Sequence, residues 1–413
     1  MRERIILHSD MNNCYASIER KMDPTLEGKP LIVCGSKKER HGIVLAKSQE
    51  AKAYGIVTGE PVTQAHQKCP GLIEVRPHYG EYIKVSKAAK AIYAQYTDLI
   101  EPYGLDECWL DVTGSTLLFG DGEQIANRIR EEIKEKLGIT VSIGVSFNKI
   151  FAKLGSDMKK PDAVTVISRE NFRQKVWPLP VSELWGVGHA TARKLSPFGI
   201  HTIGDLAAAD RDALQRILGK AGPELAAFAA GEDTSRVMPD GYCSPVKSVG
   251  HGVTTMQDLK NNEQVWLMVY RLAQDVSHRL YQAGLAATGV SIAVRDTEMV
   301  YTEYQGKTEL AVCDPYSIAK TAFQLFTKNY PWAQPIRAVT VRAIGLRPEN
   351  EAVQLSFFRS AARDEKKERL SKAADRLWCK YDKNVVMAAS LWQEVYMPPE
   401  ETVNRVMPAQ MYR

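Results

Sequence analysis

Two short acidic motifs hold the residues of this chain that are best suited to chemistry. Residues 5–17 place Asp10 shortly after an apolar run, and residues 103–111 place Asp106 and Glu107 directly before one. Carboxylates buried beside such runs are unfavourable unless a cation meets them. Three carboxylates together could hold two hard divalent cations, an arrangement used for phosphoryl or nucleotidyl transfer.

Each motif taken alone also has an ordinary structural explanation. Asp10 stands between a predicted strand and a predicted helix, where aspartate commonly caps the helix. Asp106 and Glu107 could form a simple turn or a surface pair. Neighbouring carboxylates on a strand point to opposite faces unless the backbone bends. Gly104 would help such a bend. The occurrence of both motifs, followed by further motifs in order, favours the metal site.

The first part of the chain alternates strand and helix patterns in the order β-α-β-β-α-β, with an insertion after the first strand. This order predicts a split βαβ sheet that brings the two acidic motifs together. The predicted elements are a strand at 4–7, a helix beginning within 15–22, strands at 31–35 and 42–46, helices at 79–97 and 123–137, and a strand at 141–145.

The composition changes near residues 168–180, where two prolines precede an alanine-rich stretch. Residues 181–233 are predicted to be all-helical, and the proline- and glycine-containing residues 236–246 are predicted to be a linker. Strands and helices then alternate again. They comprise strands at 287–294, 309–312 and 338–346, helices at 264–283 and 315–328, and a charged helix at 362–380.

The bulk composition limits the class of protein. A chain of 413 residues is too long for a single core, and 44% hydrophobic with 25% charged residues is typical of soluble globular proteins. Seven scattered cysteines without a Cys-x-x-Cys pair predict a cytoplasmic location and argue against structural zinc and a disulfide framework. The net charge of +5 permits a polyanionic partner without requiring one.

The motifs resemble those of Y-family translesion DNA polymerases, in the bacterial DinB-like branch. The resemblance is carried by residues 10–12, 15–17 and 106–111, and it extends from residue 4 to about residue 390. It implies an α+β multidomain fold and template-directed, low-fidelity translesion synthesis, in which a dNTP is joined to a primer 3′-hydroxyl. The implied domains are a ferredoxin-like palm (1–19 and 79–167), inserted fingers (20–78), a helix-hairpin-helix thumb (168–235), the linker (236–246), an α/β little finger (247–349) and a tail (350–413).

The resemblance also implies roles for individual residues. Asp10, Asp106, Glu107 and the carbonyl of Met11 would hold two Mg²⁺ ions, with the three carboxylates as the catalytic residues. Tyr15 would exclude ribonucleotides as a steric gate, although a core aromatic is its ordinary alternative. The nucleotide would contact Asn12, Asn13, Cys14, Tyr15, Gln49, Lys52 and Lys160.

Two nucleotide-binding positions depart from the family pattern. Gln49 and Lys52 stand where the family usually has Tyr and Arg, so nucleotide handling is expected to differ. A solvated helix charge is the ordinary alternative for Lys52. The basic cluster of Lys149, Lys153, Lys159 and Lys160 is predicted to attract the phosphates.

The resemblance also implies macromolecular partners. Gly186 and Gly188 would let backbone amides approach the phosphates of primer-template DNA, and Thr254 would contact DNA from the little finger. Residues 354–358 resemble the peptide that binds a sliding clamp, through Gln354, Leu355, Phe357 and Phe358. A final little-finger strand is the alternative for this peptide. The family further suggests a monomer, and no membrane association is expected.

Two other functions remain open at this point. A nucleotidyl cyclase also places paired carboxylates and two metal ions on a ferredoxin-like sheet, but it would need neither the helix-hairpin-helix nor the clamp-like peptide. A catalytically weakened scaffold that binds DNA or a clamp is the other, suggested by Gln49 and Lys52 and opposed by the intact Asp10, Asp106 and Glu107.

Overall fold

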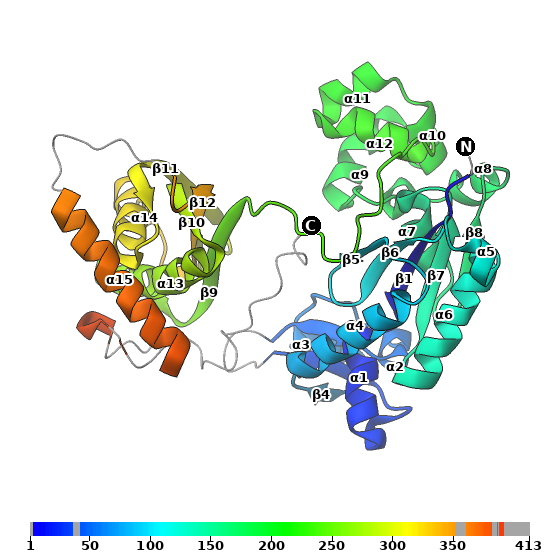
Figure 1. The fold of residues 1–413 in the computed structure, drawn as a ribbon, viewed down its shortest axis with the longest axis horizontal. Coiled ribbons are helices and arrows are strands. Elements are labelled where there is room, and N and C mark those ends of the chain that lie inside the picture. Colours follow the sequence, from blue (N-terminus) through cyan, green and yellow to red (C-terminus); the bar gives the residue numbers. More distant parts are fainter. Residues whose placement is uncertain (1–2, 36–41, 352–360, 382–385, 387, 392–413) are drawn as a thin grey trace. The chain divides into compact units, whose positions relative to one another are not determined.

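The computed structural model describes residues 3–35, 42–351, 361–381, 386 and 388–391 (Figure 1). Contacts within the chain separate it into two compact units, one of residues 3–35 and 43–244 and the other beginning at Pro245. The boundary falls inside the segment that the sequence predicts to be a linker. No helix among the described residues combines the length and apolar character needed to cross a bilayer.

A five-stranded sheet organises the first unit. Its order is β5-β6-β1-β7-β8, formed by Ile100–Tyr103, Glu107–Asp111, Ile6–Met11, Val141–Ser146 and Val164–Ile167. The first four strands are antiparallel neighbours, which confirms the split βαβ sheet. The fifth strand, β8, is parallel to β7 and was not predicted, because its alternating apolar pattern covers only four residues.

Helices cover both faces of this sheet. On one face α4 (Tyr79–Tyr93) and α6 (Gly122–Leu137) pack on Leu7 and Met11 of β1. On the other face lies α7 (Lys149–Met158), against the alternate residues of β1. The helix α7 approaches so closely that a Cβ on Gly144 of β7 would lie 1.9 Å from the carbonyl oxygen of Ala152, so only glycine fits there.

A smaller sheet with the order β3-β2-β4 occupies the insertion after β1. Its strands are Val44–Lys47, Leu31–Cys34 and Ile73–Val75. The strands β2 and β3, near the strands predicted at 31–35 and 42–46, pair in antiparallel orientation. The helices before and around it are α1 (Cys14–Met22), α2 (Gln49–Ala53) and α3 (Val62–Lys68). A short α5 (Thr116–Phe119) precedes α6.

The rest of the first unit is helical, as the composition predicts. The helices share one core with the apolar residues of α7. They are α8 (Phe172–Val176), α9 (His189–Leu195), α10 (Ile203–Ala208), α11 (Arg211–Leu218) and α12 (Ala221–Ala229).

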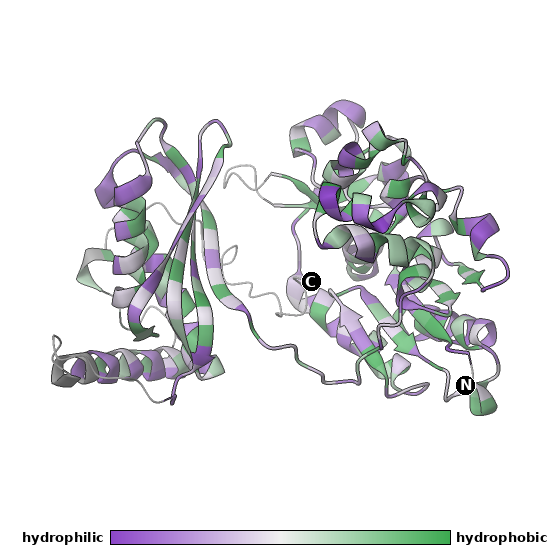
Figure 2. Ribbon diagram, turned by 90° about the horizontal axis from the view of Figure 1, so that it is seen from above, coloured by the Kyte–Doolittle hydropathy of each residue, from purple (hydrophilic) through white to green (hydrophobic). Residues whose placement is uncertain are grey.

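The second unit repeats the β-α-β-β-α-β order but pairs its strands differently, in the order β11-β10-β12-β9. Its strands are longer than the sequence predicts, and hydrophilic and hydrophobic residues alternate along them (Figure 2). The elements are β9 (Ser248–Leu259), α13 (Asn262–Ala283), β10 (Leu285–Asp296), β11 (Tyr301–Val312), α14 (Pro315–Asn329), β12 (Ile336–Pro348) and α15 (Ala361–Tyr381). The clamp-like peptide at 354–358 lies outside the described residues.

Candidate active site

The two acidic motifs meet where β1 and β6 lie side by side. Asp10 of β1 stands directly opposite Glu107 of β6 in the sheet register. Asp106 lies in the turn before β6, and its carbonyl oxygen accepts a hydrogen bond of 3.0 Å from the amide of Met11. Gly104, with φ +78°, supports this turn, so Asp106 does not follow the alternation of a strand. The structure therefore brings all three carboxylates to one end of the sheet.

The alternative explanation of Asp10 as a helix cap is wrong. The N-cap of α1 is Asn13, whose φ of +48° is a left-handed conformation that asparagine tolerates better than most residues. Asp10 is a buried strand residue, three positions earlier, with no part in starting the helix.

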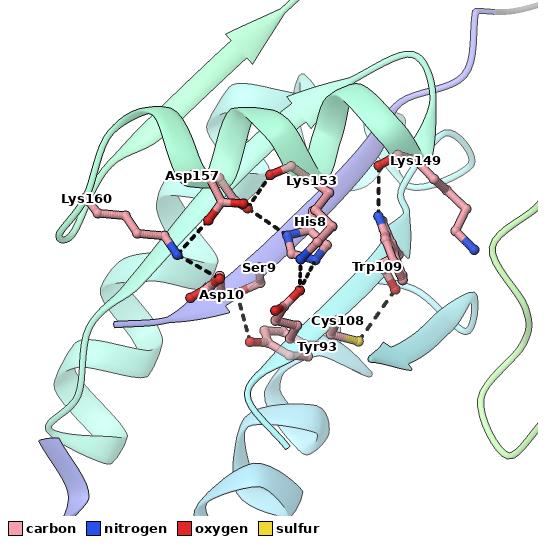
Figure 3. A network of polar contacts seen from close by, with 12 residues as sticks. His8, Ser9, Asp10, Tyr93, Cys108, Trp109, Lys149, Lys153, Asp157 and Lys160 are labelled. Carbon is pink, nitrogen blue, oxygen red and sulfur yellow. Dashed lines mark hydrogen bonds and ion pairs between the residues drawn. The ribbon is translucent and has the colours of Figure 1, made fainter. Parts of the chain in front are cut away.

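Basic side chains on and after α7 meet the carboxylates (Figure 3). Lys160 Nζ lies 2.8 Å from both Asp10 Oδ2 and Asp157 Oδ1. Lys153 Nζ forms an ion pair with Glu107, and His8 Nε2 lies 3.1 Å from the same carboxylate oxygen. The helix α7 thus supplies positive charge to a face of the sheet on which carboxylates gather.

The pKa values show how unevenly the carboxylate charge is compensated. Burial raises the pKa of Asp10 to about 7, despite the opposing charge of Lys160. Burial and the charge of Glu107 likewise raise the pKa of Asp106. Burial would also raise the pKa of Glu107, but the hydrogen bond with His8 and the charge of Lys153 lower it to about 2. Asp10 and Asp106 therefore lack enough nearby positive charge for two fully ionised carboxylates.

This unmet charge fits a divalent cation. Carboxylate oxygens are the donors that hard cations prefer, and a cation beside Asp10 and Asp106 would stabilise their ionised forms.

A cleft of about 410 Å³ opens beside these carboxylates. It brings together most of the residues that the sequence assigns to the metal and the nucleotide, but not Glu107. The lining includes Asp10, Met11, Asn12, Asn13, Cys14, Tyr15, Gln49, Lys52, Asp106 and Lys160. A cleft with carboxylates at one end and several lysines around it suits a phosphate-bearing ligand together with metal ions.

Tyr15 is held in place by other aromatic rings. Its ring stacks on Tyr82 with centroids 4.3 Å apart and an interplanar angle of 9°, and it meets Tyr79 edge-on at 5.7 Å. Tyr82 in turn donates a hydrogen bond to the buried Glu19. Tyr15 therefore has both a packed side and a side that lines the cleft.

The inserted sheet and α2 bring three positions of interest to the cleft. Gln49 and Lys52 of α2 both line it, and Lys52 is exposed. Lys47, at the end of β3, also lines the cleft and was not predicted. Burial and the charge of Lys52 lower the pKa of Lys47. Lys47 could have been identified from the sequence, because it stands two residues before the predicted nucleotide-binding residue Gln49.

The predicted phosphate-attracting lysines have separate partners. Lys149 Nζ lies 2.7 Å from Glu101 and 4.5 Å from the ring centroid of Trp109. Lys159 is exposed, and Lys153 pairs with Glu107. Of these four lysines only Lys160 lines the cleft, and the attraction of phosphates by the other three stays a prediction.

His8 is a site residue that the sequence reasoning missed. It is fully buried, and its Nδ1 lies 2.8 Å from the hydroxyl of Ser156 on α7. Burial lowers the pKa of His8 to about 4, so the ring is neutral near pH 7. Its position two residues before Asp10 places both side chains on the same face of β1, which the period of a strand could have revealed.

The predicted DNA-contacting residues are not among those that line the cleft. Gly186, with φ +90°, and Gly188, the N-cap of α9, are both exposed in the turn that leads into α9. Thr254 lies on β9, the edge strand of the second sheet.

Comparison with known proteins identifies one family over most of the chain. Residues 9–157 match the impB/mucB/samB family, residues 169–200 match the HHH motif of that family, and residues 246–357 match its C-terminal domain. A DNA polymerase IV of Acetivibrio thermocellus is 48% identical over 375 residues, which cover 91% of this chain and 94% of the relative. The chain belongs to the Y family of DNA polymerases.

Further relatives agree with this membership. DNA polymerase IV 1 of Bacillus subtilis is 37% identical over 386 residues, covering 93% of this chain and 92% of the relative. A solved Y-family DNA polymerase chimera has the same fold, with a TM-score of 0.73 and 24% identity over 83% of this chain and 98% of the chimera. The α+β fold expected from the sequence is therefore confirmed.

One prediction concerns the support of the loop that carries Lys160. Asn12 Nδ2 donates to Ser142 Oγ at 2.9 Å, and Asn12 Oδ1 accepts from the amide of Asp162 at 2.8 Å. Replacing Asn12→Ala leaves that amide without its partner and should lower the free energy of unfolding by about 1–3 kcal/mol. Urea unfolding followed by circular dichroism measures the change. Asn127→Ala, which removes an asparagine of α6 that bonds to the Glu123 carbonyl of its own helix, is the control, and unchanged stability of Asn12→Ala would contradict the assignment.

Proposed function

We propose that this chain is a template-directed DNA polymerase of the translesion type, which joins a dNTP to a primer 3′-hydroxyl and releases pyrophosphate. The observation that carries the proposal is the convergence of Asp10, Asp106 and Lys160 on one cleft that Tyr15 also lines. Membership in the Y family supports a polymerase over a nucleotidyl cyclase. The intact carboxylates support an active enzyme over a silent scaffold.

The same carboxylates would hold two Mg²⁺ ions. Asp10 and Asp106 would bind both ions, and Glu107 and the carbonyl of Met11 would each complete one site. Two such ions would stabilise the attacking and leaving oxygens of an in-line displacement. His8 and Lys153 orient Glu107 through its carboxylate oxygen, which keeps that side chain ionised.

The remaining cleft residues would bind the nucleotide. Lys160 would contact the phosphates in place of Asp10 when the metal ions neutralise that carboxylate. Lys47 and Lys52 add positive charge to the cleft, and Lys52 stands where the family usually has an arginine. The start of α1, at Asn12, Asn13 and Cys14, would lie against the nucleotide, with the ring of Tyr15 against its sugar.

DNA and a sliding clamp would be the macromolecular partners. The exposed turn at Gly186 and Gly188 and the edge strand with Thr254 would contact the DNA backbone, which gives sequence-independent binding. Gln354, Leu355, Phe357 and Phe358 would bind the clamp. We further propose a cytoplasmic monomer with the palm, fingers, thumb and little-finger boundaries given by the sequence.

The carboxylates are tested by removing them. Asp10→Ala and Asp106→Ala should each reduce primer extension with Mg²⁺ by more than about a hundredfold, since loss of mere supporting groups at metal sites already costs about 10- to 100-fold. Extension of a labelled primer, on intact and abasic templates, measures the activity, and fluorescence anisotropy checks that DNA binding is retained. Asp98→Ala removes an exposed carboxylate of the same unit and should extend normally. Normal extension by Asp10→Ala would refute the proposal.

The role of Tyr15 as a steric gate is tested by removing its ring. Tyr15→Ala should raise the ratio of ribonucleotide to deoxynucleotide incorporation by about 10- to 200-fold, the range that steric pockets commonly discriminate. Tyr15→Phe keeps the ring and its stacking on Tyr82, so it should keep the discrimination. Single-nucleotide incorporation with rNTP and dNTP measures both variants. Equal ratios for Tyr15→Ala and the unchanged protein would remove the gate role.

The clamp contact is tested by shortening its apolar residues. A double variant, Leu355→Ala with Phe358→Ala, should bind a bacterial sliding clamp at least about tenfold more weakly, because truncating two anchors of a docking peptide costs more than about 1 kcal/mol each. Surface plasmon resonance on immobilised clamp measures the affinity. Leu370→Ala removes another exposed leucine, 71% exposed on α15, and should leave binding unchanged. Unweakened binding by the double variant argues for another attachment site.

A further inference from the structure

A mixed group of metal-binding side chains lies where α15 packs on α13 in the second unit. His278 comes from α13, and Asp375 and Cys379, one helical turn apart, come from α15. One donor atom from each residue lies within 4.8 Å of the other two. The group is separate from the carboxylates of the cleft, which belong to the first unit.

The three side chains are in contact with one another and with two neighbouring residues. His278 Nδ1 lies 2.7 Å from Asp375 Oδ1, and Cys379 Sγ lies 3.9 Å from Asp375 Oδ2. Gln282, one turn after His278, donates from Nε2 to Cys379 Sγ at 3.1 Å. The ring of Trp378 stacks on His278 with centroids 4.7 Å apart. The imidazole is therefore held in a fixed orientation.

The carboxylate of Asp375 would be stabilised by a nearby cation. Its side chain is only 12% exposed, and among the described residues its partners are an imidazole and a thiol, with no lysine or arginine. Lys372, one turn earlier, is engaged by Glu349 at 2.9 Å and Glu368 at 2.7 Å. A carboxylate with so little solvent contact is costly without a positive partner.

A second group in the same unit provides the contrast. Cys313, Glu349 and Glu368 also offer three donor atoms within 4.8 Å. There the ammonium group of Lys372 already supplies the positive charge. The two groups therefore differ in their charge balance. Among the described residues, a lysine pairs with the carboxylates of the second group, whereas Asp375 contacts an imidazole and a thiol but no lysine or arginine.

We propose that His278, Asp375 and Cys379 form a binding site for Zn²⁺ or a similar borderline metal ion. Imidazole nitrogen, thiolate sulfur and carboxylate oxygen are its usual protein ligands, and a fourth position is left for water or the Gln282 amide oxygen. The thiol proton leaves to solvent on binding, and His278 binds as the neutral imidazole. Hard ions such as Mg²⁺ are disfavoured by the sulfur and nitrogen donors.

This site is compatible with the absence of a Cys-x-x-Cys pair. His278 and Asp375 are 97 residues apart in sequence and meet only because α15 docks on α13. The bound ion would join the two helices within the second unit. The sequence-based expectation of no structural zinc considered only donors at short spacing.

The test uses the reactivity of Cys379 in the full-length chain. Cys243 and Cys379 are the two exposed cysteines, so a Cys243→Ser background leaves Cys379 as the exposed thiol. One equivalent of Zn²⁺ should slow its reaction with Ellman's reagent at least about tenfold, and Co²⁺ should give a thiolate-to-cobalt charge-transfer absorption band. The readouts are independent of polymerase activity.

Matched variants separate this site from other metal-binding groups. Asp375→Asn keeps the shape of the side chain and should weaken Zn²⁺ protection of Cys379 at least about tenfold. Glu368→Gln, at the lysine-filled group, and Asp106→Ala, in the cleft, should leave that protection unchanged. Circular dichroism checks the folding of each variant. Equal thiol reactivity with and without Zn²⁺, or undiminished protection in folded Asp375→Asn, would overturn the proposal.

Discussion

The cost of burying carboxylates at the end of the central strand governs the structure of the first unit. Asp10 lies on β1 between two antiparallel neighbours, with Glu107 opposite it and Asp106 in the adjoining turn. Burial raises the pKa of Asp10 and Asp106, so these groups require cations from somewhere. Lys153 and Lys160 supply part of that charge, and the helix that positions them must pack closely on the sheet.

That close packing explains several residues with no chemistry of their own. Gly144 is needed because α7 approaches β7 so closely that any side chain would meet the backbone of Ala152. His8 fills the space between Glu107 and Ser156 of α7, and it stays neutral because it is fully buried. The site thus depends on the sheet-to-helix contact as much as on its acidic residues.

The departures from the family pattern also have a structural context. Gln49 and Lys52 lack the aromatic ring and the planar cation usual at those positions, yet Lys47 and Lys52 together keep that wall of the cleft basic. The ammonium group of lysine is a point charge, whereas the planar guanidinium group of arginine can bind a phosphate through two parallel hydrogen bonds. We therefore expect the cleft to attract phosphates still, but to orient them less strictly. The active polymerase, rather than the weakened scaffold, is therefore the better account of these residues.

The sequence alone determined the two acidic motifs, the family and the order of most helices and strands, because motif spacing and apolar periodicity are local properties. It could not pair Lys153 with Glu107 or find the short strand β8, since these depend on strand register and on which helix covers which face. The group at His278, Asp375 and Cys379 likewise exists only after α15 docks on α13. Contacts between residues far apart in sequence are decided by packing, and no local pattern encodes them.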